Sequence, residues 1–154
     1  MRDLSAIIKA YDVRGLYPEQ LDETLARDIG AAFVKVLESG SADGPPQTIV
    51  VGQDMRPSGP SLVSAFSEGV TSQGCDVIQI GLCSTDGLYH ASGWLGLPGA
   101  MFTASHNPAE YNGIKLCRSG AAPVGQDSGL AEIRTIVEGG APPAAATLGQ
   151  VREQ

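Results

Sequence analysis

Residues 103–108 read Thr-Ala-Ser-His-Asn-Pro, and Lys115 follows soon after them. A serine hydroxyl can carry a transferred group covalently, and an imidazole or an amine nearby can move the proton that such a transfer requires. The apolar run at residues 99–102 ends just before this stretch, so we expect Ser105 at a strand-to-loop junction. Ligands of open α/β sheets bind at such junctions. The pattern therefore predicts a site here, although each residue type alone is also common in ordinary polar loops.

Turn residues predict how the chain enters and leaves this loop. The Asn-Pro pair at 107–108 stiffens the turn, because proline fixes φ and keeps the residue before it out of the helical region. Asn112-Gly113 is expected to reverse the chain, and residues 114–116 are expected to leave as a new strand. Since the connection is short, the strands on its two sides should pair antiparallel.

Helices alternate with short apolar strands along the rest of the chain. Apolar spacing predicts helices at about 22–39, 59–73 and 85–94 and a last one ended by the glycines at 139–140, with strands at 48–51 and 76–80. Ser58 is expected to cap the second helix. This alternation predicts an α/β fold with a mixed, mostly parallel sheet.

Composition limits the classes of partner. The 154 residues, 42% of them hydrophobic, are the size of one domain with a real core. The chain has 10 basic and 17 acidic residues and a net charge of −7, which gives no electrostatic footprint for nucleic acid or an anionic membrane. Any phosphate must therefore be held by local groups, such as Arg14, Lys115 and backbone amides.

The three cysteines, Cys75, Cys83 and Cys117, are odd in number and lack the spacing of metal ligands. Each lies in or beside an apolar segment, which favours a small buried side chain over a nucleophile. The N-terminus has no signal-peptide pattern, and no apolar run reaches membrane-spanning length. We therefore expect a soluble protein of the reducing cytoplasm.

Four motifs together resemble those of the α-D-phosphohexomutase superfamily. Residues 103–108 resemble its phosphoserine loop, and Tyr-Asp-Val-Arg-Gly at 11–15 resembles its N-terminal phosphate-contacting segment. Residues 52–58 resemble its G-x-D-x-R-x-S signature, and residues 81–85 resemble the loop before the active-serine strand. Four motifs in the family's order are a much stronger signal than one. The resemblance implies a three-layer α/β/α sandwich around a mixed sheet of about four strands.

The resemblance also implies catalytic roles. Ser105 would carry the phosphoryl group, and its phosphate would be a ligand of Mg²⁺. Lys115 would be a proton shuttle, and Arg14 a contact to the transferring phosphoryl group. Taken alone, Arg14 is a surface arginine after a turn, and Lys115 is a lysine that points outward from a strand. Their places in the motifs favour the functional interpretation.

Five further residues receive an expected role, three of them within the site and two as its support. Tyr11 and Asn107 are expected, with Arg14, to bind substrate. His106 is counted with the catalytic residues, as an orienting hydrogen-bond partner and not as a general base. Asp54 and Arg56 are expected to form an ion pair that braces the serine loop, so they are left out of the site.

The implied function is that of a phosphomannomutase or phosphoglucomutase, which interconverts hexose 6-phosphate and hexose 1-phosphate through a bisphosphorylated sugar. Phosphoglucosamine mutase is the alternative, but residues 11–15 resemble the first branch. The implied partners are a phosphorylated hexose and hexose 1,6-bisphosphate as activator. A serine hydrolase is disfavoured, because no G-x-S-x-G elbow surrounds Ser105.

The resemblance covers one domain of a four-domain family. Residues 1–140 would be the active-serine domain, and residues 141–154 a linker and the start of the next domain. The chain contains no Asp-x-Asp pair, so the remaining Mg²⁺ ligands would come from the second domain of the parent protein. We therefore expect the isolated chain to be inactive, and a non-catalytic phosphate-binding module stays open as an alternative.

Overall fold

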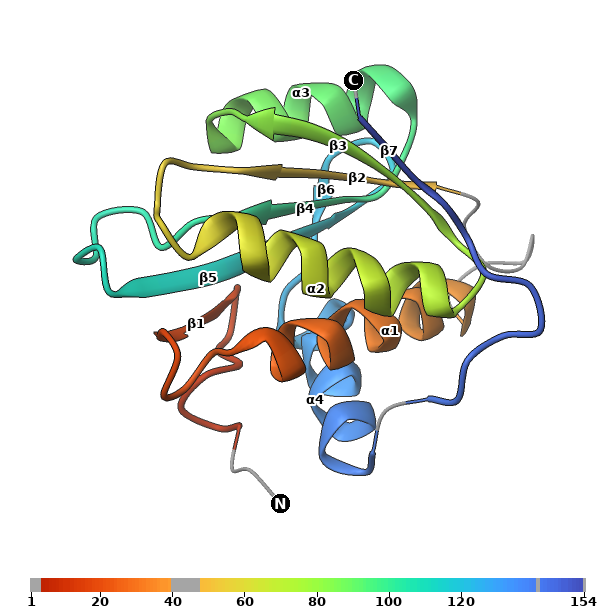
Figure 1. Ribbon diagram of the computed structural model, residues 1–154, viewed down its shortest axis with the longest axis horizontal. Helices are drawn as coiled ribbons and strands as arrows, with labels where there is room; N and C mark the ends of the chain where they lie inside the picture. The colour runs from red at the N-terminus through yellow and green to blue at the C-terminus, as the bar shows by residue number, and fades with distance from the viewer. Residues whose placement is uncertain (1–3, 40–47, 141, 154) are drawn as a thin grey trace.

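A mixed β-sheet forms the middle layer of the protein (Figure 1). The computed structural model describes residues 4–39, 48–140 and 142–153. The elements are β1 (Val13–Leu16), α1 (Glu23–Ser39), β2 (Thr48–Gln53), α2 (Gly59–Ser72), β3 (Asp76–Leu82), α3 (Thr85–Leu95), β4 (Gly99–Phe102), β5 (Tyr111–Arg118), β6 (Ala122–Pro123), the 3-10 turn η1 (Gln126–Ser128), α4 (Leu130–Glu138) and β7 (Val151–Glu153). The strand order is β1-β5-β4-β2-β3-β7, with β6 paired to β5.

The sheet is larger than the four strands that we predicted. Over the described residues it has seven strands, because three short strands extend the predicted core of β2, β3, β4 and β5. The pairs β2–β3, β2–β4 and β3–β7 are parallel, whereas β1–β5, β4–β5 and β5–β6 are antiparallel. The prediction of a mixed sheet and of an antiparallel β4–β5 pair is confirmed, and over the described residues β5 is the one strand that runs against the direction of the others.

Helices cover both faces of the sheet, as a three-layer sandwich requires. α1 and α2 lie on one face, with α4 packed against α1, and α3 lies on the other face (Figure 1). The larger core lies under α1 and α2 and includes Phe66, whose ring meets Phe102 edge-on at 5.3 Å. A smaller cluster under α3 contains Met101 and Cys117.

The helix predictions are largely confirmed. α1 begins after Asp22, whose side chain accepts a hydrogen bond from the Leu25 amide as a cap would. The predicted end of α1 at Gly40 lies outside the described residues. Ser58 precedes α2, but its side chain makes no cap hydrogen bond. Its hydroxyl accepts a hydrogen bond from Asn112 instead, so Ser58 occupies the predicted N-cap position but does not cap the helix through its side chain.

The chain reverses earlier than the Asn112-Gly113 pair predicted. Both residues lie inside β5, where Gly113 pairs with Arg14 of β1. A side chain at Gly113 would run into the backbone carbonyls of Val13 and Thr103. Gly113 is therefore needed for close strand packing and not for a turn.

The segment predicted as a linker contacts the sheet. β7 pairs in parallel with β3, the amide of Ala145 donates to the Ser72 carbonyl, and the Gln150 amide donates to the Asp76 carboxylate. The domain boundary near residue 140 stays a prediction, but the described residues beyond it are held against α2 and β3. In this described part of the chain, no helix is both long and apolar enough to cross a bilayer.

Gly69 of α2 packs tightly against the backbone of α1, and this contact leads to a prediction about stability. A methyl group on Gly69 would collide with the backbone carbonyl of Arg27, whereas one on Gly93 in α3 would meet no atom within 4 Å. We expect Gly69→Ala to lower the free energy of unfolding by about 1–3 kcal/mol through overpacking. Gly93→Ala, the matched control, should leave it unchanged or raise it by up to about 1 kcal/mol. Urea unfolding of both variants is the measurement, and equal stabilities would contradict the packing argument.

Candidate active site

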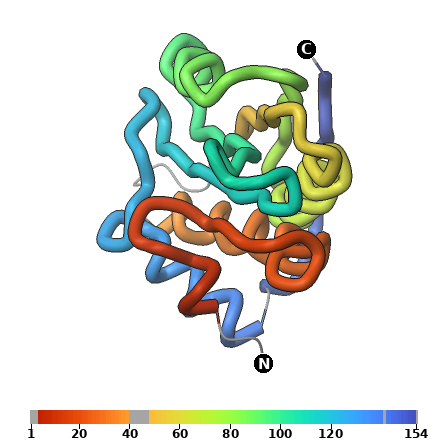
Figure 2. Tube along the Cα trace, turned by 90° about the vertical axis from the view of Figure 1, so that its left-hand side faces the viewer, coloured from red at the N-terminus to blue at the C-terminus, as the bar shows by residue number. Residues whose placement is uncertain are grey.

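Ser105 lies in the loop between β4 and β5, at the edge of the sheet where β2, β3 and β4 end. Figure 2 looks onto this edge and shows the loop between the N-terminal segment and the connection from β2 to α2. Ser105 itself is exposed, whereas Thr103 and Ala104 just before it are buried. The predicted strand-to-loop placement of the serine is confirmed.

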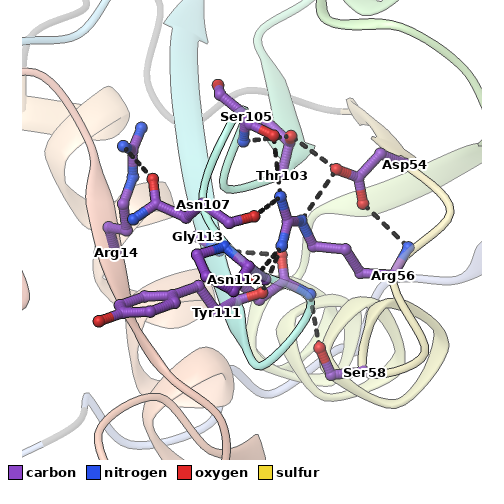
Figure 3. Close-up of polar contacts among 11 residues, drawn as sticks. Arg14, Asp54, Arg56, Ser58, Thr103, Ser105, Asn107, Tyr111, Asn112 and Gly113 are labelled. Carbon is purple, nitrogen blue, oxygen red and sulfur yellow. Dashed lines mark hydrogen bonds and ion pairs between the residues drawn. The ribbon is translucent and has the colours of Figure 1, made fainter.

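The backbone of Ser105 is held in an uncommon conformation. Its φ is 54°, in the left-handed region, which costs a residue with a side chain about 1–2 kcal/mol. Its amide donates to Thr103 Oγ1 at 3.0 Å, and its carbonyl accepts from Arg56 Nη2 at 2.9 Å. Both sides of the residue are therefore fixed, and Figure 3 shows its side chain pointing away from the groups that hold it.

Arg56 and Asp54 brace the loop, as the sequence predicted. Arg56 is 7% exposed, and its Nε lies 3.2 Å from Asp54 Oδ2. The same carboxylate oxygen accepts a hydrogen bond from the Thr103 hydroxyl at 2.7 Å. Thr103 thus links Asp54 to the amide of Ser105. Thr103 was not among the predicted site residues, because its only sequence signal is its place two residues before Ser105.

Asn112 anchors the far end of the loop to α2. Its side chain is fully buried, donates to the Ser58 hydroxyl at 2.8 Å and accepts from the Gly113 amide. Asn112 was interpreted as a turn residue, so its buried amide was missed too. Ser58, the last residue of the G-x-D-x-R-x-S motif, therefore bonds the start of β5, which follows the serine loop.

Arg14 reaches the loop from the opposite side (Figure 3). One nitrogen of its guanidinium bonds Asp12 at 2.7 Å, and the other donates to Asn107 Oδ1 at 3.0 Å. Its Nε is buried and has no hydrogen-bond acceptor among the residues that the structure describes. Arg14 and Asn107, both predicted as site residues, are thus in direct contact at the loop that carries Ser105.

The strand register places Lys115 on the same side of the sheet as Arg14. Val13 pairs with Ile114, and both lie in the core under α1 and α2. Because successive side chains of a strand alternate between faces, Arg14 and Lys115 lie on the other face, where α3 packs. Lys115 is half-buried and has no ion pair among the described residues.

Two predicted residues are exposed and not fixed. The side chain of Tyr11 is 84% exposed. His106 is exposed next to Ser105, and within the described residues its ring makes no hydrogen bond that would orient it. Their assigned roles in binding and catalysis stay predictions.

The described residues do not form a metal site by themselves. Over residues 4–39, 48–140 and 142–153, no group of three or more His, Cys, Asp or Glu side chains comes together in a way that could hold a cation. Asp12 and Asp54, the acidic residues of this site, are engaged by arginines. The side chains of these described residues therefore do not by themselves fit a resident Mg²⁺.

A family model describes the same domain. The model of "Phosphoglucomutase/phosphomannomutase, alpha/beta/alpha domain I" matches residues 5–143, which is most of the chain. The chain belongs to this family. Its match includes every candidate site residue named above, so Ser105 and its bracing network lie inside domain I.

Relatives of domain I with curated names are mutases. The chain is 45% identical over 130 residues to "Phosphohexose mutases" of Xanthomonas campestris, and 41% identical over 133 residues to the phosphomannomutase of Salmonella montevideo. These alignments cover 84% and 86% of this chain but only 28% of either relative. The chain therefore spans less than a third of the length of these curated relatives.

Solved structures show the same fold. A Phosphoglucomutase/phosphomannomutase family protein from Burkholderia thailandensis matches with a TM-score of 0.83 at 30% identity, over 99% of this chain and 33% of that one. A putative phosphomannomutase from Thermus thermophilus matches with a TM-score of 0.78 at 25% identity, over 94% of this chain and 32% of that one. The α/β fold of domain I is thus shared with both.

The cysteines are poor nucleophiles in this domain. All three are free thiols, and burial raises the pKa of Cys75 to about 12. Burial also raises the pKa of Cys83 and of Cys117. Because only the thiolate reacts readily, burial disfavours all three thiols as nucleophiles.

This thiol chemistry can be tested by alkylation. In the native chain at pH 8 we expect iodoacetamide to modify the half-buried Cys83 first and to leave Cys75 and Cys117 unmodified, because both are fully buried. In denaturant all three should react, which is the control for reagent quality. Peptide mass spectrometry is the measurement, and fast native modification of Cys75 would contradict the assignment.

Proposed function

We propose that this chain is the phosphoserine domain of a phosphomannomutase or phosphoglucomutase, which interconverts hexose 6-phosphate and hexose 1-phosphate. The observation that carries the proposal is the presentation of Ser105. Its hydroxyl is exposed at the edge of the sheet, while its backbone is held by hydrogen bonds on both sides. The mutase names of the relatives support the substrate class.

In the proposed reaction phospho-Ser105 gives its phosphoryl group to the free hydroxyl of the sugar phosphate. The serine oxygen–phosphorus bond breaks as the sugar oxygen bonds to phosphorus, and the sugar hydroxyl loses its proton. The product is a hexose 1,6-bisphosphate, which turns over and returns its other phosphate to Ser105. Lys115 passes this proton to the serine oxygen that leaves, and in the return step it carries the proton of Ser105 to the sugar oxygen that leaves. Added bisphosphate primes an unphosphorylated serine.

The cationic groups near the loop support this assignment. Arg14 presents the planar fork that suits a bidentate phosphate contact, and its buried Nε lacks an acceptor. Asn107, held by Arg14 at 3.0 Å, lies at the same rim. We assign Arg14 to the transferring phosphoryl group, Tyr11 and Asn107 to the sugar phosphate, and His106 to the orientation of the serine loop.

Mg²⁺ is proposed as the cofactor of the whole enzyme. Bound at the serine phosphate, it would supply charge stabilisation during transfer. Since the described side chains form no metal cluster, its other ligands would come from the part of the enzyme beyond this domain. The part of the enzyme beyond this domain would also select the hexose.

The isolated chain is expected to show no mutase turnover. The chain spans about a third of the solved relative from Burkholderia thailandensis, so an isolated domain that only binds phosphate is the alternative function. With Mg²⁺ and glucose 1,6-bisphosphate, glucose 1-phosphate should stay unconverted in a coupled assay. Robust turnover by the purified chain, absent in a parallel Ser105→Ala preparation, would overturn this division of labour.

Variants of the full-length enzyme test the roles of the three residues. Ser105→Ala deletes the acceptor oxygen and should leave almost no activity. Lys115→Met removes a proton carrier, and loss of general acid–base help should slow turnover by about 10²–10⁴-fold. Arg14→Ala should fall near the lysine variant, because it removes charge stabilisation and not the nucleophile.

The measurement is kcat for the three variants at identical metal and activator concentrations, with intact mass reporting the phosphoserine. Lys115→Met should still become phosphorylated, whereas Ser105→Ala should not. If Ser105→Ala were as active as Lys115→Met, Ser105 would not be the phosphoryl carrier.

A further inference from the structure

We infer that Arg56 is a positioning residue for phosphoryl transfer: with Asp54 and Thr103 it fixes the left-handed backbone of Ser105 and so sets where the acceptor oxygen lies. The inference rests on the proposed function, because it names the groups that orient the serine of that site. Arg56 itself touches no substrate in this assignment and acts through the serine loop.

The first observation is what the guanidinium bonds. Nη1 donates to the carbonyls of Pro108 at 2.6 Å and Tyr111 at 3.1 Å, and Nη2 donates to those of Ser105 and Asn107, both at 2.9 Å (Figure 3). Three of these carbonyls belong to the loop between β4 and β5, the fourth belongs to the first residue of β5, and all converge on one side chain. Such convergence fixes the path of the loop, since moving any of its peptide groups breaks a hydrogen bond to a buried charge.

The second observation is a closed ring of interactions around Ser105. The Ser105 carbonyl bonds Arg56, whose Nε bonds Asp54 Oδ2. The same carboxylate oxygen accepts from Thr103 Oγ1, which in turn accepts from the Ser105 amide. The ring therefore holds both peptide groups of Ser105, which is the residue of the loop with φ at 54°.

Together the two observations indicate that these contacts orient Ser105 itself and do not only stabilise the loop. A brace alone requires contacts anywhere on the loop, whereas this ring closes on the amide and carbonyl of the proposed nucleophile. In a transfer that runs in both directions, the same oxygen must be the leaving atom and the attacking atom, so its position matters to each step. A misplacement of about 1 Å can slow such a reaction by roughly 10²-fold.

Thr103 offers a matched pair of variants. Thr103→Ser keeps the hydroxyl that bridges Asp54 and the Ser105 amide, whereas Thr103→Val keeps the size of the side chain and removes the bridge. Arg56→Lys keeps the charge, but its single ammonium cannot span four carbonyls. Val36→Ala, a core truncation in α1 at a residue 2% exposed, serves as a control that lowers stability without touching the loop.

Amide hydrogen exchange of the 154-residue chain is the first measurement. Thr103→Val should speed exchange of the Ser105 amide by at least about tenfold, the effect of one lost hydrogen bond, and Thr103→Ser should leave it within about twofold of the unmodified chain. This readout is independent of mutase activity, so it tests the ring even if the proposed function fails.

The kinetic measurement uses the full-length enzyme below the unfolding temperature of every variant. Thr103→Val and Arg56→Lys should lower kcat by about 10²-fold and leave KM within about twofold, while Thr103→Ser and Val36→Ala should retain the kcat of the unmodified enzyme. If Arg56→Lys fails to fold, the Thr103 pair decides alone.

Two results would overturn the inference. One is a kcat for Thr103→Val equal to that of Thr103→Ser, which would make the ring a structural feature only. The other is unchanged exchange of the Ser105 amide in Thr103→Val, which would show that the ring does not hold this residue. Absence of turnover in the unmodified full-length enzyme would instead refute the proposed function and leave the exchange result to judge the ring.

Discussion

A guanidinium buried in a protein has to be matched by acceptors in the plane of its five N–H donors. Arg56 meets this requirement with one carboxylate, three backbone carbonyls of the β4–β5 loop and the carbonyl of Tyr111 at the start of β5. The loop in turn cannot relax without leaving that charge unpaired, and breaking a buried ion pair typically costs about 3–5 kcal/mol. This cost is larger than the roughly 1–2 kcal/mol by which a left-handed backbone destabilises a residue such as Ser105. The interactions of Arg56 therefore hold Ser105 in that conformation.

The sheet topology explains why this interaction forms at all. β2 and β4 are parallel neighbours, so the segment after β2, which carries Asp54 and Arg56, emerges beside the segment after β4, which carries Ser105. β5 returns antiparallel to β4 and pairs with β1, which brings Arg14 to the opposite side of the same loop. The serine loop is thus held between two arginines that come from distant parts of the chain.

Local signals made much of this predictable from the sequence. Apolar spacing and the acidic start identified α1, and the Asp54–Arg56 brace followed from two charges just before a helix. The errors all concern contacts between distant segments. The signature Ser58 was predicted as a cap, but it bonds Asn112 across the domain, and the short strands β1 and β7 exist only because β5 and β3 offer them edges. Asn112-Gly113 has the composition of a turn, yet the space between β1 and Thr103 requires the glycine within a strand.

Under the proposed function, the charges of the site imply a division of labour between this domain and the rest of the enzyme. Phosphorylation gives a serine a charge of about −1.5 to −2, in a chain whose net charge is already −7. Of the site's cations, Arg14 is paired with Asp12 and Arg56 with Asp54, which leaves Lys115 as the one without an ion pair in the described part of the chain. One lysine carries a single positive charge and so cannot balance a phosphate dianion. Under the proposed function, the described residues would therefore supply the oxygen and its orientation, and the greater part of the compensating positive charge would come from outside this domain.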